Sequence, residues 1–171
     1  MDRIEIDYTE IVAMQDAFRR APDIVMNELI GATVQSTLLA ERETRDRTPV
    51  GVGGDGGLRG SIAAQEPSVL EAEVIGETGS PLAYVIPVEL GTRPHFPPVS
   101  ALTDWVRHKL GVPEEEVEDV AFLVARKISI HGTEGARMFH RMFGANEAQF
   151  AAIYRAARDR VVARMAEEGR A

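Results

Sequence analysis

The stretch TPVGVGGDGGLRG, residues 48–60, separates two parts of this sequence that have different patterns. It holds six glycines in thirteen residues. Because glycine loses more backbone entropy on ordering than any other residue, neither a regular helix nor a strand tolerates that density. We therefore predict a flexible loop here, with helical sequence before it and strand-like sequence after it.

The sequence before the loop has mainly helical periodicity. Residues 3–7 alternate apolar and charged side chains, which predicts a short strand. Apolar residues then recur at helical spacing from Ile11 to Phe18, and Pro22 stands where a proline is typical of the first turn of a second helix. That second helix is expected to run to about Glu43. Its packing face is predicted to be Met26, Leu29, Ile30, Thr33, Thr37 and Ala40.

Three strand-like runs follow the loop. Apolar side chains alternate with others within them, which is typical of half-buried strands. Turn-forming residues at 66–68 and 78–81 separate the runs, so we expect hairpin connections. Pro87 cannot donate a ladder hydrogen bond, which places the third strand at an edge or at a bulge. The runs are Leu58–Gln65, Val69–Gly76 and Ala83–Leu90.

The second half of the chain is predicted to be helical. Ser100 is a suitable N-cap for a short helix that Gly111 closes, and Pro113 lies near the start of the next helix. The first turns of that next helix carry acidic side chains, which suit the positive end of the helix dipole. A long final helix follows the sequence HGTEG, residues 131–135. Its apolar face is predicted to be Phe150, Ile153, Tyr154, Ala157, Val161 and Met165.

These patterns predict an α+β fold. A small antiparallel sheet of three or four strands is expected to pack against the N-terminal helix, with the glycine-rich loop between helix and sheet. Residues 1–111 would form this core domain. Residues 112–171 would form a helical extension packed on the same domain.

The composition narrows the classes of function. The chain has no cysteine, so disulfides, thiolate nucleophiles and cysteine-bound metal centres are excluded. Its 27 acidic residues against 19 basic ones are the reverse of the basic excess typical of nucleic-acid binders. We expect no secretory signal and no membrane span, because no basic start leads into an apolar run and no apolar run is long enough. A cytosol-like compartment is therefore expected.

No stretch carries the pattern of a catalytic or metal-binding motif. The glycine-rich loop lacks the lysine of a phosphate-binding loop, and a strand is expected after it where such loops need a helix. The histidines form no HExxH pattern and the serines no GxSxG elbow. The acidic run 114–119 lacks the spacing of a calcium loop. Trp105 is expected to pack in the core. We predict no catalytic residue, no cofactor and no metal.

The segment ELGTRPHFPP, residues 89–98, combines a strand end with three prolines around Phe96. Prolines hold such a segment stiff and extended, so it loses little entropy when it docks. It could be a connector to the Ser100 helix, or an arm that lies on a neighbouring subunit.

The order of these segments resembles the tail-completion, or head–tail joining, proteins of long-tailed bacteriophages. Members show Pro-Val, then Thr-Gly-x-Leu-Arg-x-Ser, then a Tyr-Ala strand ending in Val-Glu-aromatic-Gly-Thr and a proline-rich segment with a phenylalanine. The resemblance covers about residues 25–110; the longer loop GVGGDGG and the proline at 87 depart from it. The matching positions are Pro49, Val50, Gly57, Leu58, Arg59, Ser61, Tyr84, Val88, Glu89, Gly91, Thr92, Pro94, Phe96 and Pro97.

The resemblance implies a structural virion protein that forms a ring, commonly of six subunits. The ring would lie in the phage neck, between a portal-side adaptor or stopper protein and the tail terminator or tail tube. DNA would pass through it without specific binding. From the acidic balance of the chain, we further expect a lumen lined with carboxylates. Assembly in the cytoplasm of the host bacterium is expected.

Two other functions remain open: a tail terminator or minor capsid protein of the same fold, and a small enzyme that binds a phosphorylated ligand. The subunits of a ring meet through two different patches. The residues expected at subunit or partner interfaces are Val52, Gly54, Asp55, Gly57, Leu58, Arg59, Glu89, Thr92, Arg93, His95 and Phe96.

Overall fold

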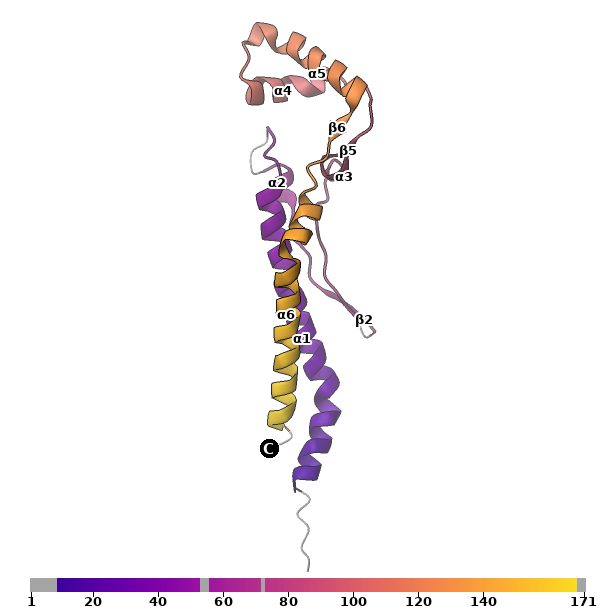
Figure 1. Ribbon diagram of the computed structural model, residues 1–171, viewed down its shortest axis with the longest axis vertical. Coiled ribbons are helices and arrows are strands. Elements are labelled where there is room, and N and C mark those ends of the chain that lie inside the picture. Colours follow the sequence, from indigo (N-terminus) through magenta and orange to yellow (C-terminus); the bar gives the residue numbers. More distant parts are fainter. Residues whose placement is uncertain (1–8, 53–55, 72, 169–171) are drawn as a thin grey trace, which may run out of the picture. The chain divides into compact units, whose positions relative to one another are not determined.

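The computed structural model describes residues 9–52, 56–71 and 73–168 (Figure 1). Contacts between residues divide the chain into two compact units. The first unit contains residues up to Leu39, Gln65–Glu77 and residues from Asn146 onward, and the second contains Ala40–Ala64 and Thr78–Ala145. The boundary expected after residue 111 lies inside the second unit.

Helix α1 is a single helix, Thr9–Arg47. The prediction of two helices separated at Pro22 is wrong, because Pro22 lies inside α1. A proline within a helix leaves the carbonyl four residues earlier without its N–H partner. Pro22 is exposed, so water can reach this part of the helix and satisfy that carbonyl. The strand expected at residues 3–7 lies outside the described residues.

The first unit is built on α1 and the long helix α6, Met138–Glu168, which run antiparallel and side by side (Figure 1). Ala32 and Leu39 of α1 pack against Ile153 and Ala157 of α6, and the partly buried Phe150 covers this cluster. The alanines let the two helix backbones approach closely. As predicted, Thr33, Thr37 and Ala40 of α1 are buried.

A buried carboxylate fixes the register of the two helices. The Glu28 side chain is 8% exposed and pairs with Arg160 at 2.6 Å and with Arg164 at 3.1 Å. Nearer the free ends of the helices, Arg20 pairs with Glu168 at 3.4 Å. A carboxylate taken out of water needs charged partners, and two guanidinium groups one helical turn apart supply them.

A short hairpin completes the first unit. Strands β2 (Ser68–Leu70) and β3 (Glu73–Ile75) pair antiparallel, with Ser68 opposite Ile75. The prediction of one continuous strand from Val69 to Gly76 is therefore wrong. The chain reverses within it at Glu71, whose φ of 53° lies in the left-handed region. Gly76 then lies against the methyl groups of Thr33 and Thr37 on α1, where a larger residue would not fit.

The second unit consists of short elements. In chain order after the end of α1 they are α2 (Leu58–Ser61), β1 (Ala63–Ala64), β4 (Thr78–Gly79), α3 (Val85–Leu90), β5 (Gly91–Thr92), α4 (Ser100–Trp105), the π-helical turn η1 (Val106–Leu110), the 3-10 turn η2 (Glu114–Glu116), α5 (Val117–His131), β6 (Thr133–Glu134) and the start of α6.

Two of the predicted strands are largely helical. Residues 58–61 form the helical turn α2, in which the Ser61 hydroxyl donates to the Leu58 carbonyl at 2.8 Å. Within that run, the strand β1 contains only Ala63 and Ala64. Residues 85–90 form α3. Pro87 is the third residue of α3, where the N–H has no partner inside a helix, so a proline costs nothing there.

The fold class is confirmed as a mixture of helices with small antiparallel sheets. The predicted sheet of three or four strands is wrong, because each sheet in the described part of the chain has two strands: β1–β4, β2–β3 and β5–β6. Strands of two or three residues bury too little side-chain surface to form one continuous layer.

The helices of the second half are close to their predicted positions. Gly111 ends the α4–η1 helix with φ 63°, and η2 and α5 follow Pro113 as expected. The Ser100 side chain, however, does not cap α4, since the residue at that position is Val99. The core of this helical region consists of Val106, Val117 and Ala121, with Val99, Leu102, Val112, Val120 and Val124 packed against them.

Candidate interaction site

The first half of the segment ELGTRPHFPP is bound to the rest of the second unit by strand pairing. Gly91 and Thr92 of β5 lie opposite Glu134 and Thr133 of β6. The Thr92 N–H donates to the Thr133 hydroxyl at 3.1 Å, and the two threonine hydroxyls are 3.0 Å apart. Thr92, which we expected at an interface, therefore joins two parts of its own unit that are 41 residues apart in sequence.

Two glycines allow these strands to approach each other. Gly91 has φ 79° and Gly132 has φ 70°, a region that residues with a side chain rarely adopt. A Cβ added to Gly91 would overlap the Thr133 carbonyl, and a Cβ added to Gly132 would overlap the Thr92 carbonyl. Strands β5 and β6 can pair only because both positions are glycine.

Glu89 caps the start of α6. Its carboxylate accepts the backbone N–H groups of Phe139 at 3.1 Å and His140 at 3.2 Å. The first N–H groups of a helix have no partner inside the helix and carry its positive dipole end, so a carboxylate is favoured there. The Glu89 backbone carbonyl also accepts the N–H of Arg137 at 3.0 Å. Glu89 thus stabilises α6 from a distant part of the sequence.

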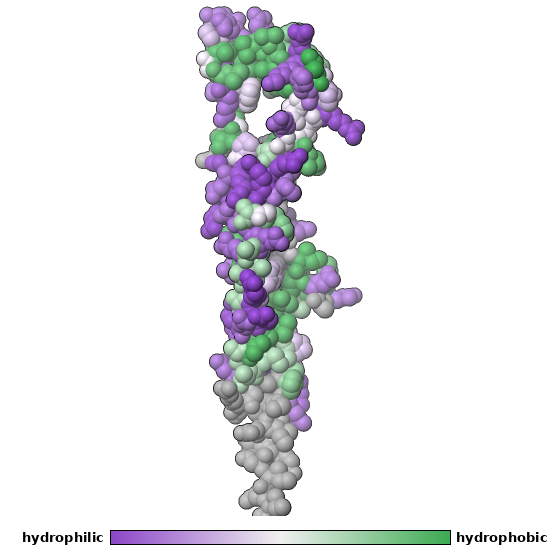
Figure 2. Space-filling model, in the orientation of Figure 1, coloured by the Kyte–Doolittle hydropathy of each residue, from purple (hydrophilic) through white to green (hydrophobic). Residues whose placement is uncertain are grey.

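The second half of the same segment is exposed. Arg93, His95 and Phe96 are all exposed, and the Phe96 side chain keeps 53% of its surface in solvent. The Phe96 ring lies 6.0 Å from the ring of Phe122 on α5, measured between centroids and tilted by 59°. Phe122 is itself 51% exposed, so the two rings form an exposed aromatic pair. On the face drawn in Figure 2, hydrophobic residues gather over α4 and α5.

The residues at the C-terminal end of the glycine-rich loop are hydrogen-bonded to the end of α1. The Arg59 guanidinium donates to the Thr48 carbonyl at 3.3 Å and to the Asp46 carbonyl at 3.5 Å, which ties α2 to the end of α1. Leu58 is buried at 6% exposure, Gly57 is half-buried, and Val52 is exposed. The other two loop residues that we expected at an interface, Gly54 and Asp55, lie outside the described residues.

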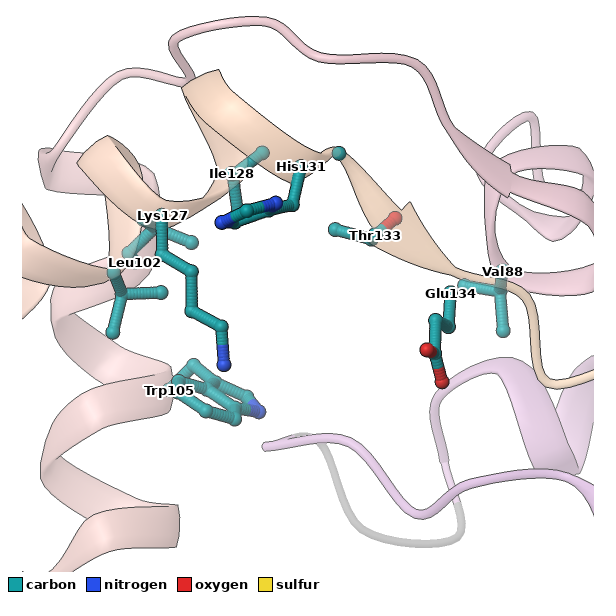
Figure 3. A pocket seen from close by; sticks show the side chains of 10 residues that line it. Val88, Leu102, Trp105, Lys127, Ile128, His131, Thr133 and Glu134 are labelled. Carbon is teal, nitrogen blue, oxygen red and sulfur yellow. The ribbon is translucent and has the colours of Figure 1, made fainter.

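A groove lies beside β6 in the second unit (Figure 3). Its volume is about 990 Å³, and Trp105 lies on one wall. The prediction that Trp105 packs in the core is wrong, since the side chain is 40% exposed. We call this feature the Trp105 groove. Its lining consists of Val88, Leu102, Trp105, Val124, Lys127, Ile128, His131, Gly132, Thr133 and Glu134.

The sequence contains little that could have revealed this groove. Trp105 follows Leu102 at helical spacing, which is the pattern of a core residue. Its exposure depends instead on where α5 lies, because the valines of α5 pack against Val106 and leave Trp105 at the edge of the helix pair. Segments from residues 102–105, 124–128 and 131–134 meet at the groove only in the folded chain.

An ion-pair cluster fixes the wall of the groove that carries Trp105. The Arg107 guanidinium donates to both carboxylate oxygens of Glu114, at 2.8 and 2.6 Å, and to Asp104 at 2.7 Å. These bonds tie η1 to η2 across the turn at Gly111. The hydrogen bonds and positive charge of Arg107 lower the pKa of Glu114 below its ordinary value of 4.5, and the carboxylates in turn raise the pKa of Arg107.

We predict that the Glu114 pair loses its contribution to stability in acid. Because the folded pKa of Glu114 lies below the unfolded value, the contribution is complete above about pH 4.5 and is lost as the pH falls through the folded pKa. NMR titration should show that the pKa of Glu114 lies below its ordinary value of 4.5. In an Arg107→Gln variant the pKa of Glu114 should return to its ordinary range, and an unchanged value would contradict the assignment.

The described residues contain no group of three or more histidine, aspartate or glutamate side chains placed to hold a metal ion. In that same part of the chain, no helix combines the length and apolar character needed to cross a membrane. No protein-family model matches the chain, and no curated protein or solved structure proved similar enough to count as a match.

Proposed function

We propose that this chain is a structural subunit of the neck of a long-tailed bacteriophage, which forms a ring that completes the tail and joins it to the head connector. Six subunits is the number that the resemblance implies. The partners would be a portal-side adaptor or stopper protein on one side and the tail terminator or tail tube on the other. The ring would assemble in the bacterial cytoplasm and function in the virion without catalysing a reaction.

The observation that supports this proposal most strongly is the division of the segment ELGTRPHFPP into two halves. Glu89, Gly91 and Thr92 are fixed by bonds to residues 133–140. Arg93, His95 and Phe96 leave this anchor and are exposed. A rigid base with an exposed aromatic tip loses little entropy on docking, so it suits a permanent contact between subunits.

The exposed apolar surface of the second unit agrees with assembly. Besides Phe96 and Phe122, the unit exposes Ile86 at 63%, Leu90 at 74% and Leu123 at 59%. Single exposed apolar residues are ordinary, but large apolar patches usually mark a binding surface. The formal charge of −8 is compatible with DNA passing through the ring without adhering to it.

We expect a Phe96→Ser variant to fold normally and to assemble poorly. Burying a phenylalanine contributes on the order of 2 kcal/mol, so self-association should weaken about tenfold or more. The molecular mass of the purified full-length chain should be measured against concentration by analytical ultracentrifugation, and the assemblies imaged by electron microscopy. Val162→Ser provides a control, since Val162 is 63% exposed on α6 in the first unit.

Four outcomes decide between the alternatives and test the interface. Rings that co-purify with the portal-side stopper support a joining protein, whereas rings that co-purify with the tail tube alone support a tail terminator. A chain that stays monomeric at every concentration and in the presence of virion components contradicts the ring. If a Phe96→Ser variant assembles like the unmodified chain, Phe96 does not lie at the subunit interface.

A further inference from the structure

We propose that the Trp105 groove receives residues 93–96 of a second copy of this chain, a segment that we call the Phe96 tip. The inference rests on the self-association proposed above, for which it names the surface that the tip contacts. Three features of the second unit support it. The tip and the groove lie on opposite faces of α5, the groove has an apolar and aromatic lining, and the two surfaces carry complementary charges.

The opposite placement of tip and groove follows from the geometry of α5. Phe96 packs beside Phe122 of this helix, with the ring centroids 6.0 Å apart. Successive residues of a helix are rotated by about 100°, so His131 lies about 180° around α5 from Phe122 and Lys127 lies about 140° from it. His131 and Lys127 both line the groove. The tip therefore cannot enter the groove of its own chain while Phe96 stays on Phe122.

This arrangement suits a contact between copies. Both surfaces belong to the second unit. A copy that offers its tip to one neighbour keeps its groove free for the tip of another. Such a head-to-tail contact uses two different patches of the same chain, and it closes into a ring when the rotation from one copy to the next allows closure.

The lining of the groove suits an aromatic side chain. Leu102 and Trp105 line it from α4 and η1 follows them, while Val124 and Ile128 line it from α5. Figure 3 shows the Trp105 ring facing the open space. The volume of about 990 Å³ is at the upper end of the range of small-molecule pockets, roughly 300–1,000 Å³, and leaves room for Phe96 with its flanking prolines. Two aromatic rings also favour each other in tilted or offset arrangements.

The surface around the tip is cationic at one end and acidic at the other. Arg93 is exposed, and its backbone lies beside Gly132, just after the end of α5. Glu118 and Asp119 are exposed near the start of α5, where they line a pocket together with Phe122. The positive and negative charges around the aromatic pair therefore lie at opposite ends of this helix.

The groove also carries one charge of each sign on its two sides. Figure 3 shows Glu134 on one side of the opening and Lys127, beside Trp105, on the other. Glu134 can pair with Arg93 of the second copy. Lys127 can pair with the carboxylates at the start of α5 in that copy. Such pairs contribute little affinity when exposed, but they select the orientation and the partner.

Mixing two full-length variants that each lack one surface tests the inference. The acceptor, Phe96→Ser, keeps the groove and loses the tip. The donor, Trp105→Leu with Glu134→Arg, keeps the tip, contains no tryptophan and has a groove that repels Arg93. Each variant alone should associate at least about tenfold more weakly than the unmodified chain. The mixture should form dimers of one donor and one acceptor, because one intact contact remains.

Trp105 of the acceptor reports this contact directly, since it is the only tryptophan in the mixture. Its emission should shift to shorter wavelength when the donor is added, and analytical ultracentrifugation should show the dimer. A donor that also carries Phe96→Ser is the matched control and should cause neither change. Circular dichroism shows whether each variant is folded. If the donor does not fold, Lys127→Glu with Glu134→Arg replaces it, and dimer formation is then the measurement.

Exchanging one charge pair tests the orientation of the tip in the groove. Arg93→Glu and Glu134→Arg should each weaken association severalfold. The chain that carries both changes should recover, because each copy then again meets the opposite charge at this position.

The outcomes separate this inference from the proposed function. If folded donor and acceptor form no dimer, or form one without a shift of Trp105 emission, the tip docks elsewhere and the inference is wrong; the ring stands as long as the unmodified chain associates. A doubly changed chain that stays as weak as the single variants also overturns the inference. If the unmodified chain stays monomeric in the presence of virion components and the mixture does too, both proposals fail.

Discussion

A Gly132→Ala variant is expected to lose about 3 kcal/mol or more of unfolding free energy, the largest effect of any single substitution that we predict. Gly132 has φ 70° and ψ −156°, a conformation that is nearly restricted to glycine. The added Cβ would also overlap the backbone carbonyl of Thr92, which cannot move without breaking the β5–β6 pair. Gly91→Ala should cost a similar amount, because its Cβ would overlap the Thr133 carbonyl in the same strand pair.

The chain contains matched controls for this prediction. Gly111 also has a positive φ of 63°, but nothing lies within 4 Å of an added Cβ, so Gly111→Ala should cost only about 1 kcal/mol. Gly144 lies inside α6 with nothing near its Cβ position, so Gly144→Ala should stabilise the chain by roughly 0.5–1 kcal/mol.

Denaturant unfolding followed by Trp105 fluorescence measures these changes, because Trp105 and all four glycines belong to the second unit. If Gly111→Ala and Gly132→Ala lose the same unfolding free energy, backbone strain alone determines the loss, and the close approach of the strands adds nothing to it.

Removing the carboxylate of Glu89 is the second large effect that we expect. Glu89→Ala should lower the unfolding free energy by about 2 kcal/mol, since two N–H groups at the start of α6 lose their acceptor and the helix dipole loses a negative charge. Hydrogen exchange of the Phe139 and His140 amides should accelerate, while the amides near the centre of α6 should change much less.

Glu89→Gln separates the two contributions. The glutamine carbonyl oxygen can still accept one N–H, but the charge is gone, so the expected loss is about 1 kcal/mol. If Glu89→Ala leaves stability and amide exchange unchanged but abolishes assembly, Glu89 acts at an interface and the capping role is wrong.

These two predictions give different roles to parts of one motif. In the segment that resembles the phage tail-completion proteins, Glu89, Gly91 and Thr92 have partners inside their own unit. Among the residues of this segment that were expected at an interface, Arg93, His95 and Phe96 are exposed. Within this segment, the part left for the proposed interface is therefore the exposed end beside the Phe96–Phe122 pair.

The strand predictions for the runs after the glycine-rich loop were wrong for different reasons. Apolar residues in short runs fit both a strand and one face of a helix, so the alternation in Ala83–Leu90 does not distinguish a strand from the helix α3. Pro87 fits an edge strand or a bulge, and it fits equally well in the first turn of α3. In the run 69–76, alternation alone did not reveal the reversal at Glu71.

The sequence by itself determined the helices whose signals are local. Periodicity and the glycine at 111 predicted the helix that it ends, and the proline and acidic residues at 113–119 predicted the start of α5. These signals act within a turn or two of the chain, so no distant contact is needed to read them. The composition excludes cysteine chemistry directly, because the sequence contains no cysteine.

Only the tertiary structure decided which residues meet. The pairing of residues 91–92 with 133–134, the cap that Glu89 places on α6, and the groove around Trp105 all join segments that are far apart in sequence. The strand pairing requires the close approach of the backbones at Gly91 and Gly132, and a single sequence does not reveal which distant segment a glycine will contact. The glycine-rich stretch at 48–60 marked where the helical pattern stops, but the packing of the chain after it was decided by these long-range contacts.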